Sequence, residues 1–353
     1  MHAAHTASES SMSQPLTVMR EFPALDATTV RAEVFAAAQP AVLRAQVQHW
    51  PVIAAARRSA TDLVAYLRQF DNGALVDAIM TPPEVGGRVF YNEQMSGFNF
   101  IRNRLPISAV AEQVLRYAAF AGAPAVAAQS ALLRDCLPGF AADNPLGLLD
   151  AEVLPRIWLG TAITTPTHLD EWNNIGCVVS GRRRFTLFPP EQIGNLYIGP
   201  LDFAPTGAPM SLVRLHDPDF ERFPRFRAAL AAAVCAELAP GDAIYIPPLW
   251  WHHVESLEPV NLLINYWWHA IPGTAVGAAA GFEALVHALL ALRALPPATR
   301  TAWQGLFEHY VFSDAGGNVE HIPPERRGVL GTLSAEDAAR VRAYLAQRLQ
   351  AWK

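Results

Sequence analysis

Cysteine is scarce in this sequence, and no long uninterrupted apolar run occurs. The 353 residues include three cysteines, Cys136, Cys177 and Cys235. Their odd number and wide spacing match neither a disulfide framework nor a zinc-binding pattern, and they suit a reducing compartment. The chain opens without a signal-peptide pattern, and its most apolar stretch, residues 275–295, is interrupted by charged residues. We therefore expect a cytoplasmic protein with no membrane partner.

Charged residues are also few, at 17% of the chain, against 51% hydrophobic residues. This composition excludes a disordered chain, and the length allows either one large domain or two small ones. The formal net charge is −5, and no run of five or more Lys or Arg occurs. Because duplex nucleic acid is bound chiefly through basic surfaces, we expect no nucleic-acid partner.

Hydrophobic periodicity divides the chain into a predicted disordered tail at 1–15, a zone at 16–272 that ends in a β section, and a helical zone at 273–353. Before about residue 154 the pattern predicts mixed elements. These are a helix, a proline break and a strand within 35–53, a helix at 59–73 capped by Thr61, a strand at 88–95, and an amphipathic helix at 106–120 with Ser108 as its cap.

From about residue 154 the sequence changes to short β-branched and apolar runs that Gly, Pro or Asn interrupt. This pattern predicts an all-β section of short strands, as in a sandwich or a barrel. After residue 272 the helical pattern returns, with helices predicted at 274–295, 297–313 and 334–351. The last of these begins with a Ser-x-x-Asp motif of the capping-box type.

The stretch TPTHLDEWNN, residues 165–174, places His168 two residues before Asp170. If 161–174 is one strand, the alternation of side chains points both residues to the same face. An imidazole and a carboxylate on one face are two potential metal ligands. Taken alone, the pair is more typical of a hydrogen-bonded structural contact than of a metal site.

A third potential ligand lies in PGDAIYIPPLWWHHVES, residues 240–256. This stretch predicts a turn, a strand, and a second strand that carries His252 and His253. Neighbouring residues on a strand point to opposite faces, so only one of these two histidines can face inward. Two histidines and one carboxylate with open positions form the ligand set of non-haem Fe(II) oxygenases.

Residues 154–268 resemble the cupin-like (cupin_8) branch of the JmjC-type Fe(II)/2-oxoglutarate oxygenases, a group that includes an asparaginyl hydroxylase. Four motifs carry the resemblance in order, namely TPTHLDEWNN, VSGRRRFTLFPPEQIGNLY, YIPPLWWHHVES and NYWW. QPAVLRAQVQHWPV, residues 39–52, also resembles the family's entry into the fold. The resemblance implies a mainly β protein with a double-stranded β-helix (jelly-roll) core, flanking N-terminal helices and a C-terminal helical tail. The catalytic domain would span 16–272.

The resemblance also implies a role for individual residues. The iron ligands would be His168, Asp170 and His252, with His253 as the outward neighbour. The remaining candidates are 2-oxoglutarate contacts at Thr165, Asn174 and Asn265, and pocket residues at Trp267, Trp172 and Glu171.

Two positions depart from the family pattern. Where the asparaginyl hydroxylase has a lysine that pairs with the far carboxylate of 2-oxoglutarate, this chain has Arg183, between two further arginines that alternation places on the opposite face. Arg183 is a candidate for that contact, since a guanidinium binds a carboxylate well, and a solvated strand residue is the alternative. The family's tyrosine for the same carboxylate falls at Phe90 or Tyr91, and only Tyr91 offers a hydroxyl.

The function that the resemblance implies is that of an Fe(II)- and 2-oxoglutarate-dependent oxygenase, a dioxygenase that uses O2 to hydroxylate a protein or peptide side chain. One alternative is a small-molecule oxygenase, and another is a metal-binding protein without turnover. A zinc hydrolase is disfavoured because no obvious glutamate base is present, although Glu171 lies close to the ligands.

Three further expectations concern other parts of the chain. Tails of this kind often pair two subunits in the family, so residues 273–353 are expected to form a homodimer. His216 lies in a proline-bracketed stretch and is predicted to be a loop residue, which could line the substrate site, rather than a metal ligand. Trp158 is predicted to be a core residue.

Overall fold

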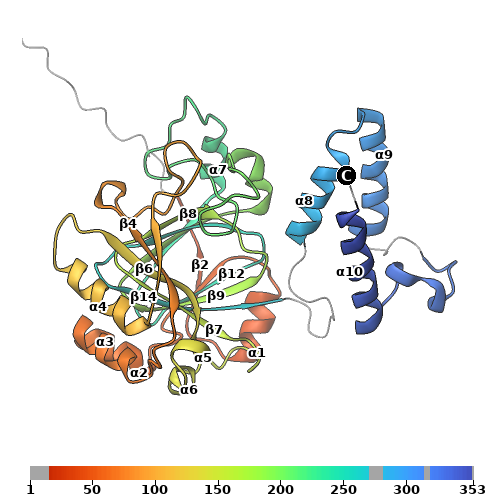
Figure 1. Ribbon diagram of the computed structural model, residues 1–353. Helices are drawn as coiled ribbons and strands as arrows, with labels where there is room; N and C mark the ends of the chain where they lie inside the picture. Colours follow the sequence, from red (N-terminus) through yellow and green to blue (C-terminus); the bar gives the residue numbers. More distant parts are fainter. Residues whose placement is uncertain (1–15, 270–280, 314–318, 352–353) are drawn as a thin grey trace, which may run out of the picture. The chain divides into compact units, whose positions relative to one another are not determined.

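The computed structural model of the protein describes residues 16–269, 281–313 and 319–351. It divides the chain into two compact units, Met1–Trp268 and His269–Lys353. The predicted tail at 1–15 and the predicted boundary at 272–273 lie outside the described residues. In the described part of the first unit, the strands form a smaller and a larger sheet, and several helices accompany them (Figure 1).

The smaller sheet has five strands in the order β1-β11-β10-β13-β8. Its pairs are antiparallel except for the parallel pair of β1 and β11. Its strands are β1 (Thr17–Val18), β8 (Thr164–His168), β10 (Arg183–Phe188), β11 (Val234–Leu238) and β13 (Trp251–Ser256).

The larger sheet has nine strands in the order β2-β3-β12-β9-β14-β7-β6-β4-β5. Its strands are β2 (Arg20–Phe22), β3 (Ala41–Leu43), β4 (Val76–Thr81), β5 (Ile101–Leu105), β6 (Ala125–Leu132), β7 (Pro155–Gly160), β9 (Asn173–Ser180), β12 (Ala243–Ile246) and β14 (Asn261–Trp268). Two facing sheets of this kind confirm the expected mainly β jelly-roll core.

The central strands of the larger sheet are buried on both faces, which explains their nearly continuous apolar sequences. On β14, Leu262, Ile264 and Tyr266 pack into the cluster that the helices cover. The alternate residues Leu263 and Asn265 face the smaller sheet, where a cavity lies between the two sheets. Strict alternation on these strands therefore separates a structural face from a face available for chemistry.

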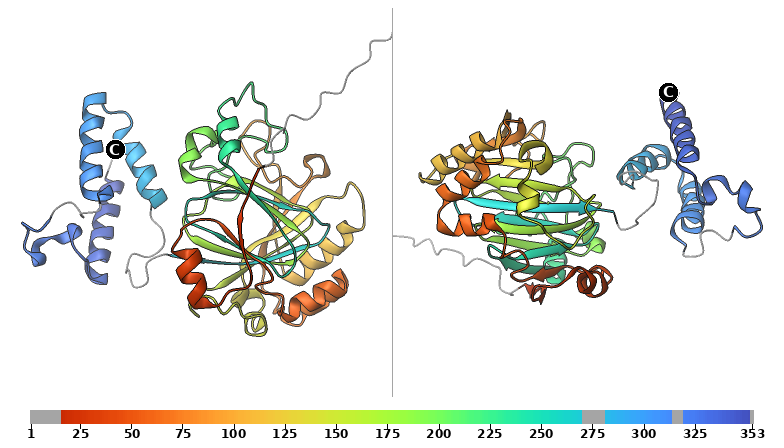
Figure 2. Two further views of the ribbon diagram at one scale, coloured as in Figure 1. Left: turned by 180° about the vertical axis from the view of Figure 1, so that it is seen from behind. Right: turned by 90° about the horizontal axis from the view of Figure 1, so that it is seen from below.

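Helices pack on the outer face of the larger sheet, as two further views of the fold also show (Figure 2). They include α2, which packs on β9, and α4, which packs on β6 and β7. The helices of this unit are α1 (Ala27–Val30), the π-helical turn η1 (Arg31–Phe35), α2 (Pro51–Arg58), α3 (Ala60–Arg68), η2 (Pro83–Val85), α4 (Ile107–Ala118), α5 (Leu133–Cys136), α6 (Phe140–Asp143), η3 (Pro190–Asn195) and α7 (Phe226–Ala232).

Two predicted elements of the N-terminal flank are wrong. In 35–53 the helix ends near Phe35, the strand occupies Ala41–Leu43, and Pro51 begins α2 instead of following a strand. Proline suits the first helical position because its missing N–H would have no partner there. Residues 88–95 form isolated bridges at Arg88 and Tyr91 and no regular strand.

The two predicted helix caps in this flank are also wrong. Ser59, not Thr61, caps α3, and its hydroxyl accepts a hydrogen bond from the Asp62 N–H. Ser108 lies inside α4, where its N–H donates to the carboxylate of Asp71 at 2.7 Å. The cap of α4 is therefore supplied by a residue 37 positions away, which no local motif could indicate.

The C-terminal unit is helical, as predicted. It contains α8 (Gly281–Leu292), α9 (Pro297–Phe307), η4 (Glu308–Phe312), η5 (Pro324–Arg326), η6 (Gly328–Leu330) and α10 (Ala335–Gln350). The predicted capping motif is confirmed, because Ser334 accepts a hydrogen bond from the Asp337 N–H at 3.1 Å. Among the described helices, none is both long and apolar enough to cross a bilayer.

Candidate metal centre

The three predicted iron ligands come together at the edge of the smaller sheet. His168 is the last residue of β8, His252 is the second residue of β13, and the two residues lie directly opposite each other across the strand pair. Their ring centroids are 4.2 Å apart, and Nε2 of His252 lies 3.5 Å from Oδ2 of Asp170. One ligand atom from each of the three residues lies within 4.8 Å of the others.

Hydrogen bonds orient both imidazole rings. Nδ1 of His168 lies 2.9 Å from the carbonyl of Pro166, and Nδ1 of His252 lies 3.0 Å from the carbonyl of Trp250. A carbonyl can only accept, so each Nδ1 carries the proton and donates it. The Nε2 lone pairs are left free, and a backbone partner of this kind commonly fixes the tautomer of a metal-binding histidine. The three side chains therefore fit a divalent transition metal.

Desolvation and neighbouring charges favour the protonation states that bind metal. Desolvation, followed by the effect of His252, lowers the pKa of His168 to about 4, so its ring is neutral at pH 7. Desolvation alone would raise the pKa of Asp170, but its contact with His252 outweighs it and lowers that pKa. A neutral imidazole and an ionised carboxylate are the forms that coordinate a cation.

Asp170 reaches the site from a turn, and the predicted single strand over 161–174 is wrong. β8 ends at His168, and β9 begins at Asn173. The carbonyl of Asp170 accepts a hydrogen bond from the N–H of Leu249 at 2.8 Å, and Leu249 adopts a left-handed φ of 64°. This contact joins the two ligand-bearing segments, and a non-glycine residue in this conformation is typical of strain held at a functional site.

A bulge in β8 places Thr165 and His168 on the same side. The pairing register shifts between the partners His252↔His168 and Val254↔Thr165, so β8 contains one extra residue there. Without the extra residue, two positions three apart on a strand would point to opposite faces. Both side chains line the cavity, as the resemblance implied for Thr165.

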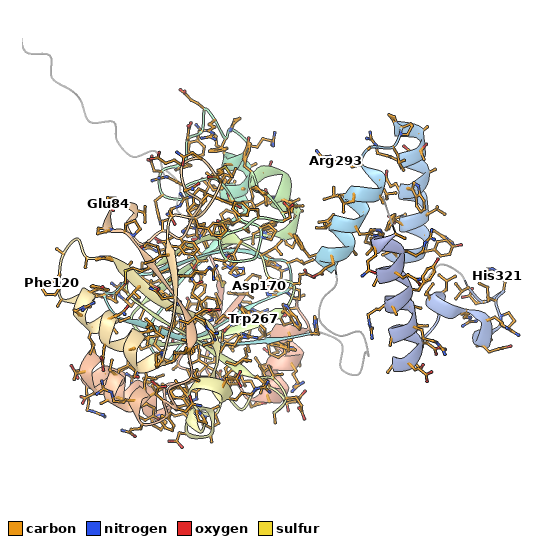
Figure 3. All side chains as sticks on the ribbon, viewed as in Figure 1. Glu84, Phe120, Asp170, Trp267, Arg293 and His321 are labelled. Atoms are coloured by element: carbon orange, nitrogen blue, oxygen red, sulfur yellow. The ribbon has the colours of Figure 1, made fainter. Side chains whose placement is uncertain are left out.

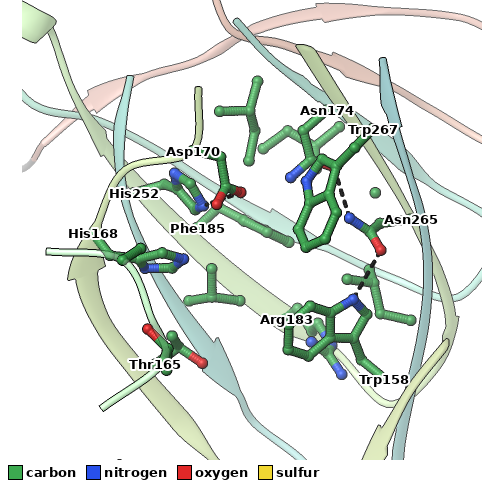
Figure 4. Close-up of a pocket in the computed structure, with 17 residues that line it drawn as sticks. Trp158, Thr165, His168, Asp170, Asn174, Arg183, Phe185, His252, Asn265 and Trp267 are labelled. Carbon is green, nitrogen blue, oxygen red and sulfur yellow. Dashed lines mark hydrogen bonds and ion pairs between the residues drawn. The ribbon is translucent and has the colours of Figure 1, made fainter. Parts of the chain in front are cut away.

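The ligands face a cavity of about 110 Å³ between the two sheets (Figure 4). This volume holds several water molecules or one small ligand, since a single water needs only ~10–15 Å³ by this kind of measure. Asp170 and Trp267 lie well inside the β fold, in contrast to the peripheral Glu84 and Phe120 (Figure 3). The lining includes Trp158, Thr165, Asn174, Arg183, Phe185, Thr206, Asn265 and Trp267 beside the three ligands.

Arg183 lies across the cavity from the three ligands (Figure 4) and is only 8% exposed. Its Nε is buried without a hydrogen-bond partner, and desolvation lowers its pKa to about 10, which still leaves it charged at pH 7. Arg182 and Arg184 instead pair with glutamates outside the cavity. Gly181, with a φ of 71°, makes the turn before β10. A buried cation without a counter-ion is unfavourable, so this end of the cavity suits an anionic ligand.

Two asparagines on neighbouring strands form a hydrogen-bonded network at the cavity wall. Nδ2 of Asn265 donates to Oδ1 of Asn174 at 3.2 Å, and the indole Nε1 of Trp158 donates to Oδ1 of Asn265 at 2.8 Å (Figure 4). Trp158 is thus a wall residue with a polar function, and its prediction as a core residue was incomplete. The network leaves the Asn174 amide nitrogen available as a donor.

Three of the predicted contacts do not line the cavity, and Phe90 does not line it either. Tyr91 is buried, does not line the cavity, and its hydroxyl donates to the carbonyl of Phe203 at 2.7 Å. The ring of Phe90 lies under the guanidinium of Arg88, 3.5 Å from its centroid. Trp172 and Glu171, although next to the ligands in sequence, are not among the lining residues.

Thr206 is a lining residue that the sequence did not indicate. Its hydroxyl is buried without a hydrogen-bond partner and borders the same cavity as Arg183. It lies in the long connection between η3 and α7, where no periodic pattern marks a role. The hydroxyl therefore offers a polar contact that Tyr91 does not.

The cupin-like domain family matches residues 27–274, which is more than half of the chain. HSPB1-associated protein 1 of Homo sapiens is 40% identical over 113 residues, which are 31% of this chain and 22% of that protein. Lysine-specific demethylase JMJ31 of Arabidopsis thaliana is 35% identical over 125 residues, which are 35% of this chain and 22% of that protein.

A longer match is to Jumonji C domain-containing protein 5 of Drosophila melanogaster, which is 30% identical over 271 residues. These residues are 72% of this chain and 62% of that protein. The chain thus spans less than two thirds of the length of each of these relatives. Because the family match covers the whole two-sheet unit from α1 onward, the chain belongs to the cupin-like domain family, of the JmjC type.

Proposed function

We propose that this protein is an Fe(II)- and 2-oxoglutarate-dependent oxygenase. One observation carries the proposal. A 2-His-1-carboxylate set with free Nε2 atoms and a buried, unpaired guanidinium line the same cavity from opposite sides. Such a cavity matches a ligand that chelates a metal at one end and carries a carboxylate at the other.

In this proposal the chain's own residues hold and orient the reactants. His168, Asp170 and His252 would hold Fe(II), which supplies O2 activation coupled to the oxidation of 2-oxoglutarate to succinate and CO2. Arg183 would bind the far carboxylate of 2-oxoglutarate. The lining residues Thr165, Asn174 and Thr206 supply polar contacts along it, and the apolar wall, including Phe185 and Trp267, excludes water.

The size of the cavity supports a protein or peptide side chain as the substrate. The cavity is about 110 Å³, and 2-oxoglutarate would share this space with any substrate. Only a small part of the substrate could then reach the metal, which suits one side chain of a larger molecule. A small-molecule substrate would need additional enclosed volume, so hydroxylation of a protein or peptide is the favoured assignment.

Two outcomes compete with this assignment. JMJ31 is named a lysine-specific demethylase, so demethylation must be separated from hydroxylation by the mass of the product. A metal-binding protein without turnover is the second candidate function, because the Tyr91 hydroxyl is committed to Phe203 and not to the cavity.

The test is an anaerobic titration of the apoprotein with Fe(II) and then 2-oxoglutarate. Chelation of a keto acid to such an iron gives a weak visible charge-transfer band. We expect the band in the wild type, its loss in His168→Ala, and a weaker affinity for 2-oxoglutarate in Arg183→Gln. Arg182→Gln is the matched control, because Arg182 pairs with surface glutamates and should leave the titration unchanged.

The outcomes separate the candidates. A band followed by succinate formation under air supports the oxygenase. Tight iron binding with neither a band nor succinate would contradict it and favour the metal-binding protein without turnover. Product masses with candidate peptides then distinguish hydroxylation from demethylation.

We further propose that the C-terminal helices pair two copies of the chain. Leu290, Phe312 and Tyr344 are 70%, 68% and 60% exposed, which is unusual for large apolar side chains in helices. Burying such residues against a second copy would stabilise the unit. Light scattering should show a dimer that Leu290→Asp dissociates, whereas Phe120→Asp, at an equally exposed site of the first unit, should not. A monomeric wild type would contradict this proposal.

A further inference from the structure

A second cluster of potential ligands lies on the other face of β13. His252 and Val254 line the cavity, so the alternate residues His253 and Glu255 point away from it. His216, from the connection between η3 and α7, reaches this outer face. One ligand atom from each of His216, His253 and Glu255 lies within 4.8 Å of the others.

The contacts within this cluster leave several polar atoms without partners. Nε2 of His216 lies 2.5 Å from Oε1 of Glu255, and the rings of His216 and His253 have centroids 6.0 Å apart. His253 is only 4% exposed, and neither of its ring nitrogens has a hydrogen-bond partner. Oε2 of Glu255 is also buried without a hydrogen bond.

A buried imidazole with two unpartnered nitrogens calls for a ligand. Nearly all buried polar side-chain atoms in proteins are satisfied by protein groups, water or ions, because leaving them unsatisfied is unfavourable. His253 packs beside a carboxylate and a second imidazole, and these are the donors that bind zinc and similar ions. His216 keeps 52% of its side chain exposed, which opens the cluster to solvent for the entry of an ion.

We propose that His216, His253 and Glu255 form a second metal site, which binds a divalent transition-metal ion of the zinc class. Two imidazoles and one carboxylate supply three ligands, and the exposed side leaves a position for water. The ion would replace the contact between Nε2 of His216 and Oε1 of Glu255. This proposal uses only residues and contacts on the outer face of β13, so it does not depend on the oxygenase proposal.

Two nearby arginines lower the affinity that we expect this site to have for a metal ion. Nη1 of Arg184 lies 3.7 Å from Oε2 of Glu255, but Arg184 also pairs with Glu237 and can keep that partner. Arg88 is buried with one terminal nitrogen unpartnered and acts electrostatically on His253. Because both guanidinium groups repel a cation, this site should bind more weakly than the triad of His168, Asp170 and His252.

The second site has a structural consequence for the cavity. His216 belongs to the segment 196–225 between η3 and α7, and this segment also carries Thr206 and Ala208, which line the cavity. An ion held by His216 and His253 would fasten this segment to the strand that carries His252. Metal at the outer face would therefore hold part of the cavity wall in place.

The experiment measures the zinc stoichiometry of the full-length apoprotein by equilibrium dialysis with elemental analysis. We expect two zinc ions per chain in the wild type, one of them bound more weakly, and one ion in His216→Ala. His49→Ala is the matched control, because His49 is an exposed histidine outside both clusters and should keep two ions. His216 is half exposed, so its removal should leave the circular dichroism unchanged.

A second readout reports on the segment itself. Saturating zinc should slow amide hydrogen exchange around residues 212–218 in the wild type and in His49→Ala, and not in His216→Ala. The proposal is overturned if His216→Ala binds as many ions as the wild type, or if the wild type binds a single ion that Asp170→Ala removes. Zinc-independent exchange of this segment in the wild type would also contradict it.

Discussion

In the two-sheet unit, large apolar side chains such as Trp50, Leu67 and Ile264 are completely buried. In the described C-terminal helices, by contrast, Leu290 and Phe312 are mostly exposed, and Ala338 is the one buried apolar residue there. Both regions are rich in apolar residues, so composition does not distinguish them. The difference lies in how far the apolar side chains are covered within their own unit.

This contrast indicates where each region obtains its stability. Burying one large aliphatic or aromatic side chain contributes about 1.5–3 kcal/mol, and the two-sheet unit buries dozens. The described C-terminal helices gain little in this way within their own unit. Their stability should therefore depend on a second copy, whereas the stability of the two-sheet unit should not.

The largest expected effect tests this difference directly. Leu67→Ala should lower the free energy of unfolding by about 2–5 kcal/mol, because it leaves a cavity in a fully packed cluster. Leu290→Ala should change it by no more than about 0.5 kcal/mol in a dilute monomer. Chemical denaturation at two protein concentrations measures both. Equal losses at low concentration would remove the basis of the comparison.

The two-sheet unit also buries an unpaired charge, the guanidinium of Arg183. Arg183→Gln should raise the KM for 2-oxoglutarate by about 10–100-fold, since a charge-assisted hydrogen bond contributes roughly 1.5–3 kcal/mol. Arg182→Gln, at a solvent-exposed ion pair, should change KM by less than about twofold. Steady-state succinate formation is the measurement. Similar KM values for both variants would show that burial of Arg183 does not serve the co-substrate.

A smaller effect is expected at the wall of the cavity. Trp158→Phe keeps the ring but removes the donor to Asn265. We expect about a fivefold rise in the KM for 2-oxoglutarate, corresponding to roughly 1 kcal/mol for one neutral hydrogen bond. The circular dichroism should be unchanged. An unchanged KM would mean that the amide orientation of Asn265 is set by other contacts.

The smallest expected effects on stability concern two helix caps. Ser334→Ala in the C-terminal unit should cost about 1 kcal/mol of unfolding free energy, because it removes the capping hydroxyl. Asp71→Asn in the two-sheet unit keeps an acceptor oxygen but removes the charge at the helix start, and should cost about 0.3–1 kcal/mol. Only the second cost should depend on pH. Desolvation would raise the pKa of Asp71, but hydrogen bonds from Ser108 and Gly73 outweigh it and lower that pKa below 3.8.

The sign of this pH dependence follows from the lowered pKa. The ionised Asp71 cap stabilises the fold above its unfolded pKa of 3.8, and this stabilisation is lost as pH falls through the lower folded value. The gap between wild type and Asp71→Asn should therefore close in acid, below about pH 4. A gap that widens on acidification would contradict the assignment. The gap for Ser334→Ala should stay constant over this range.

Several features of this molecule could be predicted from the local sequence pattern alone. Alternation separated Arg183 from Arg182 and Arg184, and the capping motif at Ser334 formed as predicted. These features depend on neighbours within a few residues. The family resemblance added the candidate iron ligands His168, Asp170 and His252, which the structure brings together in one cavity.

Features that require contacts between distant segments could not be predicted in this way. Alternation predicts opposite faces for Thr165 and His168, and the bulge that reverses this comes from pairing with β13. Asp71 is not recognisable as the cap of α4 until α4 packs beside it. The commitment of Tyr91 to Phe203 likewise depends on a contact between residues 112 positions apart.

The sequence by itself thus determined most of the strand pattern after residue 154, because side-chain alternation is a local property, and its resemblance to a known family supplied the jelly-roll architecture and the candidate metal ligands. Only the tertiary structure decided that Arg183 is buried without a partner, that Thr206 borders the cavity, and that His216 meets His253. Burial and unsatisfied hydrogen bonds are properties of the packed chain, since they depend on what other segments leave uncovered. The proposed chemistry of this protein rests on those properties.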